Sequence, residues 1–128
     1  MTPPVGKQSR RHLFHLFPAW VDLGRPVWYS RRVGQEAPEF DWDDANRDHL
    51  VRHQVTPQEA EQAILDPHAI LLEIESNAGE ERAKAVGMTA RGRVLAVVFT
   101  LRGEVIRPIT AYAPSARLQV LYFQQRGT

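Results

Sequence analysis

The sequence predicts an α+β domain in which two helices pack on a small antiparallel sheet of about four strands, followed by a short C-terminal helix. The strongest observation is an unbroken apolar, β-branched run over residues 94–100, which is typical of a strand buried on both faces. Strand-like segments over 81–87 and 104–112 flank this run, and Gly92 and Gly103 stand where the chain would turn. We therefore expect the three segments to form an antiparallel meander.

The composition limits the class of protein. The 128 residues suit one domain with its own core, and 43% hydrophobic with 24% charged residues are ordinary for a soluble globular protein. The absence of cysteine excludes disulfides, thiolate metal sites and a cysteine nucleophile. The five histidines show no spacing typical of a metal site, so we expect no metal and no cofactor. No apolar run approaches the about 20 residues that span a bilayer, so we expect a cytoplasmic protein without membrane contact.

Charge is divided unevenly along the chain, although the formal net charge is only +1. The segment 82–128 carries eight lysines and arginines against one acid, Glu104, whereas 36–81 carries thirteen acids against two arginines. A basic sheet beside an acidic segment predicts that the sheet binds something anionic.

Residues 1–39 are predicted to be an N-terminal extension of the domain formed by 40–128. The prolines of this extension argue against a long helix, and its aromatic residues make it too apolar for a freely solvated tail. Two interpretations stay open: a loosely packed appendage, or an arm that binds nucleic acid through its aromatic residues and four arginines, Arg10, Arg11, Arg31 and Arg32.

A first helix is predicted from about Asp44 to Arg52. Asp43 and Asp44 supply an N-cap and acids for the positive end of the helix dipole. Asn46 lies on the same stripe of this helix as Leu50. We expect Asn46 to be buried, hydrogen-bonded and responsible for fixing the helix against the sheet.

A second helix has a clearer start. The segment 56–59, Thr-Pro-Gln-Glu, matches a capping box with proline at the first helical position. Val55 and Ala60 stand where a hydrophobic staple would pack. Asp66 and Pro67 are expected to end the helix.

The segment 69–75 alternates like a half-buried strand, with Ile70, Leu72 and Ile74 pointing one way and Leu71 the other. It precedes the meander and supplies the fourth strand.

The last third of the chain contains a strand with a proline and a short final element. Pro108 cannot donate a backbone hydrogen bond, so its strand is predicted to lie at an edge or to carry a bulge. The spacing of Leu118, Leu121 and Tyr122 favours a final helix, although a strand over 118–123 also fits the pattern.

An ordered set of short motifs resembles the BrnT family, the toxins of type II toxin–antitoxin pairs. The resemblance extends from about Phe40 to Tyr122, roughly two-thirds of the chain. The motifs are, in order, Phe-x-Trp-Asp at 40–43, Asn46, Arg52-His53, Asp66-Pro67, Gly79-Glu80-x-Arg82, the buried strand over 94–100, and Ile106-Arg107.

The resemblance implies a RelE-like fold, metal-independent cleavage of RNA and inhibition of translation. It also implies a small ribbon-helix-helix antitoxin as the partner, with DNA bound only through that antitoxin. Two other functions stay open. One is a related domain that binds an antitoxin-like protein or RNA without cutting it, and the other is an unrelated binding domain whose sheet happens to be basic.

Three positions depart from the family pattern. Tyr112 stands where the family usually has a second basic residue, Leu118 stands where its last helix carries a glutamate, and Gln54 replaces the usual glycine. The first two departures favour the domain that binds without cleaving.

Metal-free RNA cleavage needs a base for the 2′-hydroxyl, donors for the phosphoryl oxygens and an acid for the leaving oxygen. Arg82 and Arg107 are the best candidates for the donors, because a planar guanidinium gives a phosphate two hydrogen bonds. The alternative is that both are solvated strand residues or antitoxin contacts. Lys84 has the same parity as Arg82, so the two are expected on one face of their strand.

The remaining catalytic candidates each have a structural alternative. Tyr112 is the candidate acid or a stacking surface for a base, or else a core or edge aromatic residue. His53 is a candidate base near neutral pH, or else a residue that caps a helix end. Glu80 is a candidate base, or else an ion-pair partner of Arg82. Tyr122 is expected to pack the last helix, and the remaining candidates for RNA binding are Lys84, Arg91, Arg93 and Arg117.

Overall fold

The computed structural model describes residues 38–77 and 80–127, with only the backbone for 73–77 and 80–81. Residues 1–37 of the predicted N-terminal extension lie outside the described residues, and so do both interpretations of that extension. The described elements are, in order, α3 (Asp44–Val51), α4 (Pro57–Leu65), β1 (Ile70–Asn77), β2 (Glu80–Met88), β3 (Val94–Arg102), β4 (Val105–Tyr112) and α5 (Ala116–Arg126). No helix in this part of the chain is both long and apolar enough to cross a membrane.

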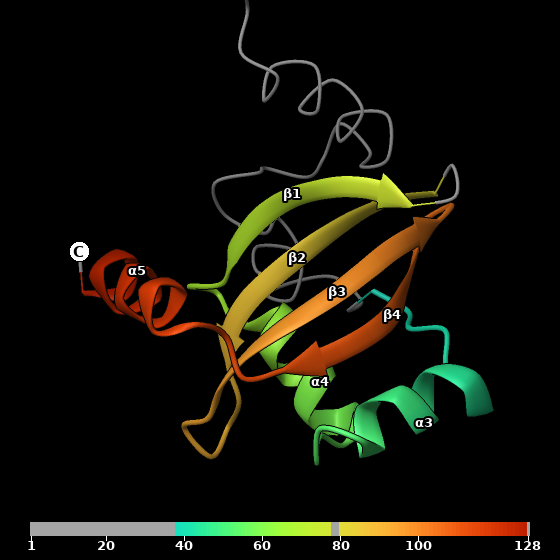
Figure 1. Ribbon diagram of the computed structural model, residues 1–128, viewed down its shortest axis with the longest axis horizontal. Coiled ribbons are helices and arrows are strands. Elements are labelled where there is room, and N and C mark those ends of the chain that lie inside the picture. Colours follow the sequence, from blue (N-terminus) through green and yellow to red (C-terminus); the bar gives the residue numbers. More distant parts are fainter. Residues whose placement is uncertain (1–37, 78–79, 128) are drawn as a thin grey trace, which may run out of the picture.

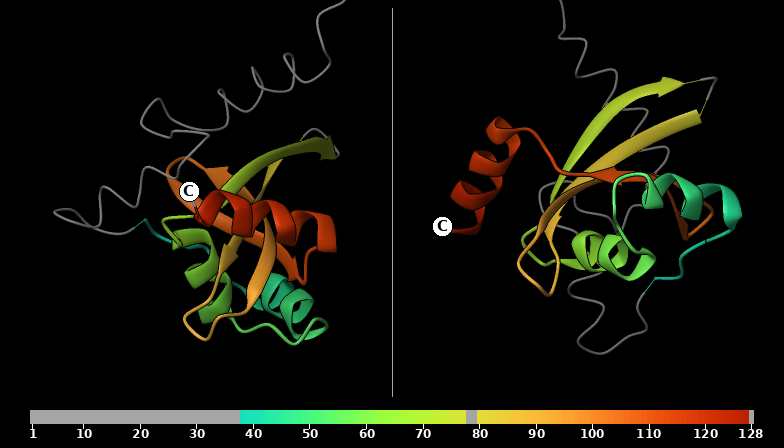
Figure 2. Two further views of the ribbon diagram at one scale, coloured as in Figure 1. Left: turned by 90° about the vertical axis from the view of Figure 1, so that its left-hand side faces the viewer. Right: turned by 60° about the horizontal axis from the view of Figure 1, so that its bottom comes forward.

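The four strands form one antiparallel sheet in the order β1-β2-β3-β4, which confirms the predicted meander. Helices α3 and α4 pack on one face, which we call the helix face, and α5 packs on the other, which we call the open face (Figures 1 and 2). The α+β class is therefore confirmed. The segment 118–123 belongs to a helix, so the strand interpretation of that segment is wrong.

Capping side chains mark where each helix begins. Asp43 caps α3: its carboxylate accepts a hydrogen bond from the Asn46 N–H at 3.1 Å, while Asn46 Oδ1 accepts one from the Asp43 N–H at 2.8 Å. Thr56 and Glu59 exchange the same pair of bonds at the start of α4, at 3.1 and 3.0 Å. The Ser115 hydroxyl caps α5. Both predicted helix starts are thus confirmed.

Strand β4 lies at the edge of the sheet and also carries the bulge predicted at its proline. Val98 pairs with Thr110, but the next residue, Phe99, pairs with Pro108. Ile109 is therefore the extra residue of the bulge. Both alternatives predicted for this proline are therefore confirmed. An edge strand with a bulge leaves fewer ladder hydrogen bonds to make, so a residue without an N–H is tolerated there.

The segment that leads into α3 covers the outer edge of β4. Ile106 donates its N–H to the Glu39 carbonyl and accepts the N–H of Asp41, both at 2.9 Å. The Asn46 amide donates to the carbonyls of Asp41 and Pro108, both at 2.9 Å, and its side chain is buried. The prediction that Asn46 fixes the first helix against the sheet is confirmed.

The main core lies between the helix face and the two helices that cover it. Its fully buried members include Leu50, Ile64, Leu95, Phe99 and Ile106. Helix α4 crosses β2 at Gly87, where a Cβ atom would stand 2.0 Å from the carbonyl oxygen of Ala63. Only glycine allows the helix to approach the strand this closely.

A smaller apolar cluster lies on the open face beneath α5. Tyr122 is fully buried there against β2 and β3. Ile70 and Leu72 pack against this smaller cluster, whereas Leu71 belongs to the main core. The predicted alternation of β1 is confirmed for the side chains of 70–72, and each face of the strand contacts an apolar cluster.

Candidate functional site

Strand pairing arranges the predicted arginines in a row across the open face. Thr100 of β3 pairs with Arg107 of β4. On β2, Ala83 pairs with Phe99 of β3. Arg82 precedes Ala83, so it lies level with Thr100 on the open face. The backbones of Arg82 and Arg107 are therefore two strands apart, roughly 10 Å at the usual strand spacing.

A second group of predicted residues meets at Tyr112. The Nζ atom of Lys84 is 5.6 Å from the centroid of the Tyr112 ring, within the range of a cation–π interaction. The centroid of the His53 ring is 6.1 Å from that of Tyr112, with the ring planes 54° apart. Lys84 and Tyr112 are half-buried and His53 is exposed, so a ligand from solvent can contact them. We call these three residues the Tyr112 cluster.

Three different elements deliver the Tyr112 cluster. Lys84 comes from β2, Tyr112 ends β4, and His53 lies in the turn that follows α3. Lys84 pairs with Val98, and Tyr112 pairs with Ala96 two residues along the same central strand. These pairings put Lys84 and Tyr112 in neighbouring rows of the open face. Helix α3 packs along β4, and its end brings His53 to the last residue of that strand.

Arg107 is held by two acids that flank the start of α3. Its Nη1 atom lies 3.0 Å from Asp43 Oδ2 and 3.3 Å from Asp41 Oδ2, and its side chain is only 14% exposed. The hydrogen bond from Arg107 lowers the pKa of Asp43 below its ordinary value, and the bond to Asp43 raises the pKa of Arg107. The observed contacts of Arg107 therefore tie β4 to the first turn of α3.

Arg93 has contacts of a similar kind at the other end of α3. Its guanidinium donates to the Gln54 carbonyl at 2.8 Å and to the His53 carbonyl at 3.3 Å, and it lies 3.4 Å from a Glu59 oxygen. The Thr56 N–H, together with the charge of Arg93, lowers the pKa of Glu59 below its ordinary value. Arg93, predicted to bind RNA, thus connects β3 to the turn that carries His53.

The other predicted site residues have no recorded contact with the Tyr112 cluster in the described part of the chain. Arg91 is exposed in the turn between β2 and β3, and Arg117 is exposed in the first turn of α5. The backbone of Glu80 pairs with Asn77 at the start of β2, and its side chain lies outside the described part of the structure.

Tyr122 and Asp66 are joined by a buried hydrogen bond, which we call the Tyr122–Asp66 joint. The sequence predicted the packing of Tyr122 but not its bond to Asp66. Tyr122 was expected to pack the last helix, which its complete burial confirms, and its hydroxyl donates to the Asp66 carboxylate. Asp66 also accepts the N–H groups of Met88 at 2.8 Å and His68 at 2.9 Å. Burial and the bond to Asp66 raise the pKa of Tyr122 to about 12. Sequence reasoning assigned Asp66 only to the end of a helix, because nothing local reveals these distant donors.

The open face offers the groups that an anionic, aromatic ligand requires. Arg82 and Lys84 lie two residues apart on one face of β2 and supply positive charge, while Tyr112 supplies a ring and a phenol beside an imidazole. Among the side chains that the structure describes, no three from histidine or acidic residues lie close enough together to hold a metal ion. The chemistry available at this site is binding of phosphate, stacking on a base, and proton transfer by phenol or imidazole.

Comparison with known proteins gives one family. The family model described as "Ribonuclease toxin, BrnT, of type II toxin-antitoxin system" matches residues 42–117, which is more than half of the chain. A search of curated proteins found no match. The matched region includes all three residues of the Tyr112 cluster and both arginines of the row across the open face.

Proposed function

This chain belongs to the BrnT family of ribonuclease toxins of type II toxin–antitoxin systems, and from that premise we propose that it cleaves RNA without a metal ion and so inhibits translation. The observation that carries the proposal is the Tyr112 cluster on the open face, whose Lys84 lies one row away from Arg82 on β2. We also propose that the arrangement of its helices on the antiparallel sheet is that of the RelE-like fold.

We assign the three residues of the Tyr112 cluster and Arg82 a role each in attack of a 2′-hydroxyl on the neighbouring phosphate. His53 takes the 2′-hydroxyl proton, and Arg82 with Lys84 stabilises the charge that grows on the phosphoryl oxygens. The Tyr112 phenol gives a proton to the leaving 5′-oxygen. Glu80 is the second candidate for the base.

Two groups of arginines support RNA binding in this proposal. Arg107 becomes the second phosphate ligand by exchanging its ion pairs with Asp41 and Asp43 for the phosphate. Arg91 and Arg117, both exposed, contact the RNA backbone further from the reacting phosphate.

The family also implies an antitoxin partner and an RNA target. We propose that the antitoxin is a small ribbon-helix-helix protein and that the pair contacts DNA through the antitoxin alone. The sheet of this chain would then be reserved for RNA.

Two observations favour a second candidate, a domain that binds RNA or an antitoxin without cutting. The resemblance to the family sets Tyr112 where a second basic residue is expected, and the charge of Arg107 is already offset by two carboxylates. Under this alternative, Tyr112 would stack on a base and no proton transfer would take place.

Cleavage of a labelled RNA by the purified full chain in the presence of EDTA tests the proposal. We expect cleavage to continue in EDTA, and Tyr112→Phe, which keeps the ring but removes the acid, to slow it by about 100-fold. Lys84→Met should lower the rate at least tenfold. Arg47→Ala, an exposed change on α3, is the control and should cleave like wild type.

The same variants separate the two candidate functions. Tight RNA binding without cleavage by the wild-type chain would overturn the ribonuclease assignment in favour of the binding domain. Equal cleavage by wild type and Tyr112→Phe would remove the phenol from the mechanism. Expression of the wild-type chain should arrest protein synthesis, and the Tyr112→Phe chain at equal abundance should not.

A further inference from the structure

Helix α5 is apolar on two opposite sides. Leu118 and Tyr122 face the sheet in the smaller apolar cluster. On the outer side, Val120 is 56% exposed and Phe123 is 48% exposed. The only other large hydrophobic side chain with comparable exposure in the described part of the chain is Val51, at 70% on α3. A helix with two apolar sides is normally covered on both.

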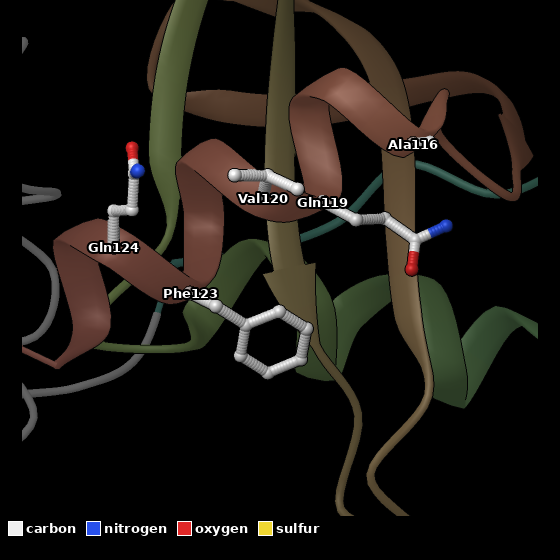
Figure 3. A pocket seen from close by; sticks show the side chains of 5 residues that line it. All are labelled: Ala116, Gln119, Val120, Phe123 and Gln124. Carbon is white, nitrogen blue, oxygen red and sulfur yellow. The ribbon is translucent and has the colours of Figure 1, made fainter.

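Two shallow hollows that share Val120 and Gln124 lie along α5, one on its outer side and one that reaches round to the sheet-facing Leu118. One hollow of about 530 Å³ is lined by Ala116, Gln119, Val120, Phe123 and Gln124 (Figure 3). In Figure 3 the Phe123 ring projects away from the helix axis. The second hollow, of about 420 Å³, is lined by Arg117, Leu118, Leu121 and again Val120 and Gln124. Apolar residues with adaptable amides around them are suited to contact with another protein.

The charge around these hollows indicates which kind of protein segment can bind in them. Helix α5 contains two arginines and no acid, and Arg117 lines the second hollow. An acidic, amphipathic segment would satisfy both the apolar side chains and this charge. The chain's own segment 1–37 carries six lysines and arginines against two acids, so it has the wrong sign. A second copy of α5 would bring like charges together.

We propose that the outer side of α5 is the surface on which the antitoxin docks, through an amphipathic segment that carries acidic residues. Apolar side chains of this segment cover Val120 and Phe123, and its carboxylates pair with Arg117. The inference rests on the toxin–antitoxin assignment but not on the Tyr112 cluster, because none of its residues belongs to that cluster.

The experiment measures the affinity of the full chain for a purified candidate antitoxin, a small ribbon-helix-helix protein with an acidic amphipathic segment. Val120→Glu and Phe123→Glu put an acid on exposed positions and should weaken binding by about tenfold or more each. Arg117→Glu should weaken binding and reduce its dependence on salt. Val51→Glu is the matched control, since it makes the same change at the exposed valine of α3 and should bind like wild type.

Each outcome decides the proposal. Unchanged affinity of Val120→Glu and Arg117→Glu, with both variants folded by circular dichroism, would overturn it, as would a wild-type chain that does not bind this antitoxin. Self-association of the isolated wild-type chain that Val120→Glu abolishes would assign the surface to a second copy instead.

The test is independent of the ribonuclease assignment. The Tyr112→Phe chain should bind the antitoxin with wild-type affinity whether or not it cleaves RNA. If the wild-type chain binds the antitoxin through α5 but cuts no RNA, only the proposed activity fails.

Discussion

Asn46 shows how one side chain joins local and tertiary structure. Its Oδ1 atom accepts the N–H of Asp43 and completes the cap of α3. Its Nδ2 group donates to the carbonyls of Asp41 and Pro108, which lie on two different segments. The buried amide therefore uses three hydrogen bonds to hold the helix, the leading segment and the bulge of β4 together.

We expect Asn46→Ala to lower the free energy of unfolding by about 2–3 kcal/mol, because it removes a cap and leaves buried carbonyls without donors. Urea denaturation of the full chain measures the change. Arg47→Ala, exposed in the same helix, is the control and should stay within about 0.5 kcal/mol of wild type. Equal stability of Asn46→Ala and this control would show that water replaces the amide at no cost.

Gln54 adopts a backbone conformation that is unfavourable for its residue type. Its φ angle is +58°, in the left-handed region that favours glycine. The Arg93 guanidinium donates to its carbonyl at 2.8 Å and so helps to hold the turn. This turn carries His53 to Tyr112, so the strain lies beside the candidate site.

Gln54→Gly should raise the free energy of unfolding by about 0.5–1 kcal/mol, since glycine accepts a positive φ without a Cβ clash. Arg52→Gly is the matched control, because Arg52 has an ordinary φ of −59° just before the same turn. That control should be destabilised by about 0.5–1 kcal/mol. A loss of stability in both variants would contradict the strain argument. Thermal and urea unfolding of the two variants measures both effects.

At the scale of elements, the fold depends on joints between segments that are distant in sequence. Asp66 follows α4, accepts an N–H from the end of β2, and accepts the hydroxyl of Tyr122 from α5. Arg126 adds a hydrogen bond to the Tyr122 oxygen at 3.0 Å. One carboxylate thus fixes the positions of three elements, and it holds α5 on the sheet with its outer side exposed.

The Tyr122–Asp66 joint predicts a loss of stability at high pH. Burial and the bond to Asp66 raise the pKa of Tyr122 to about 12, above the ordinary value of 10.0. The folded protein therefore keeps this proton at pH values where the unfolded chain releases it. The stabilisation is fully present below pH 10 and is lost as the pH rises toward 12, by about 3 kcal/mol.

Urea denaturation between pH 8 and pH 12 compares wild type with Tyr122→Phe. The Phe variant should be less stable at pH 8, because Asp66 loses a donor, and its stability should fall less steeply with rising pH. The two proteins share every other titratable group, so the difference between their two curves belongs to Tyr122. Parallel curves for wild type and Tyr122→Phe would contradict the assignment.

At the scale of the whole molecule, opposite charges are placed on different parts of one small domain. Acids gather at the start of α3, where Asp41 and Asp43 pair with Arg107, while Arg82 and Lys84 share one face of β2. Long-range attraction of a polyanion is therefore directed to the open face.

RNA binding by the full chain should weaken steeply as salt concentration rises, because each phosphate contact releases counterions. Lys84→Met should weaken binding at low salt and reduce the slope of the logarithm of the affinity against the logarithm of salt concentration by about 1. Arg93→Met should leave that slope unchanged, since Arg93 binds His53, Gln54 and Glu59. A slope that Lys84→Met leaves at the wild-type value would exclude Lys84 from contact with RNA. Fluorescence anisotropy with a labelled oligonucleotide measures both slopes.

The sequence alone was sufficient wherever the controlling contacts are local. Helix caps join residues a few positions apart, so Asp43 as an N-cap residue and the spacing of Thr56 with Glu59 predicted the two helix starts, and the structure added the bond from Asn46 back to Asp43. A proline disturbs its own strand, so Pro108 predicted an edge position or a bulge, and the strand has both. The ordered motifs also predicted the family, because their order and type survive in the linear sequence.

Only the tertiary structure decided which partners the charged and aromatic residues have. Arg107 was predicted to bind the reacting phosphate and Arg93 to bind RNA beside Lys84, but the packing of α3 brings carbonyls to Arg93 and carboxylates to Arg107. The register of β2, β3 and β4 then sets Lys84 beside Tyr112, with His53 brought in by α3. The physical reason is the separation in sequence of the interacting residues. The spacing of neighbouring residues determines secondary structure, whereas the ionic partners of a side chain depend on strand register and helix packing between segments dozens of residues apart.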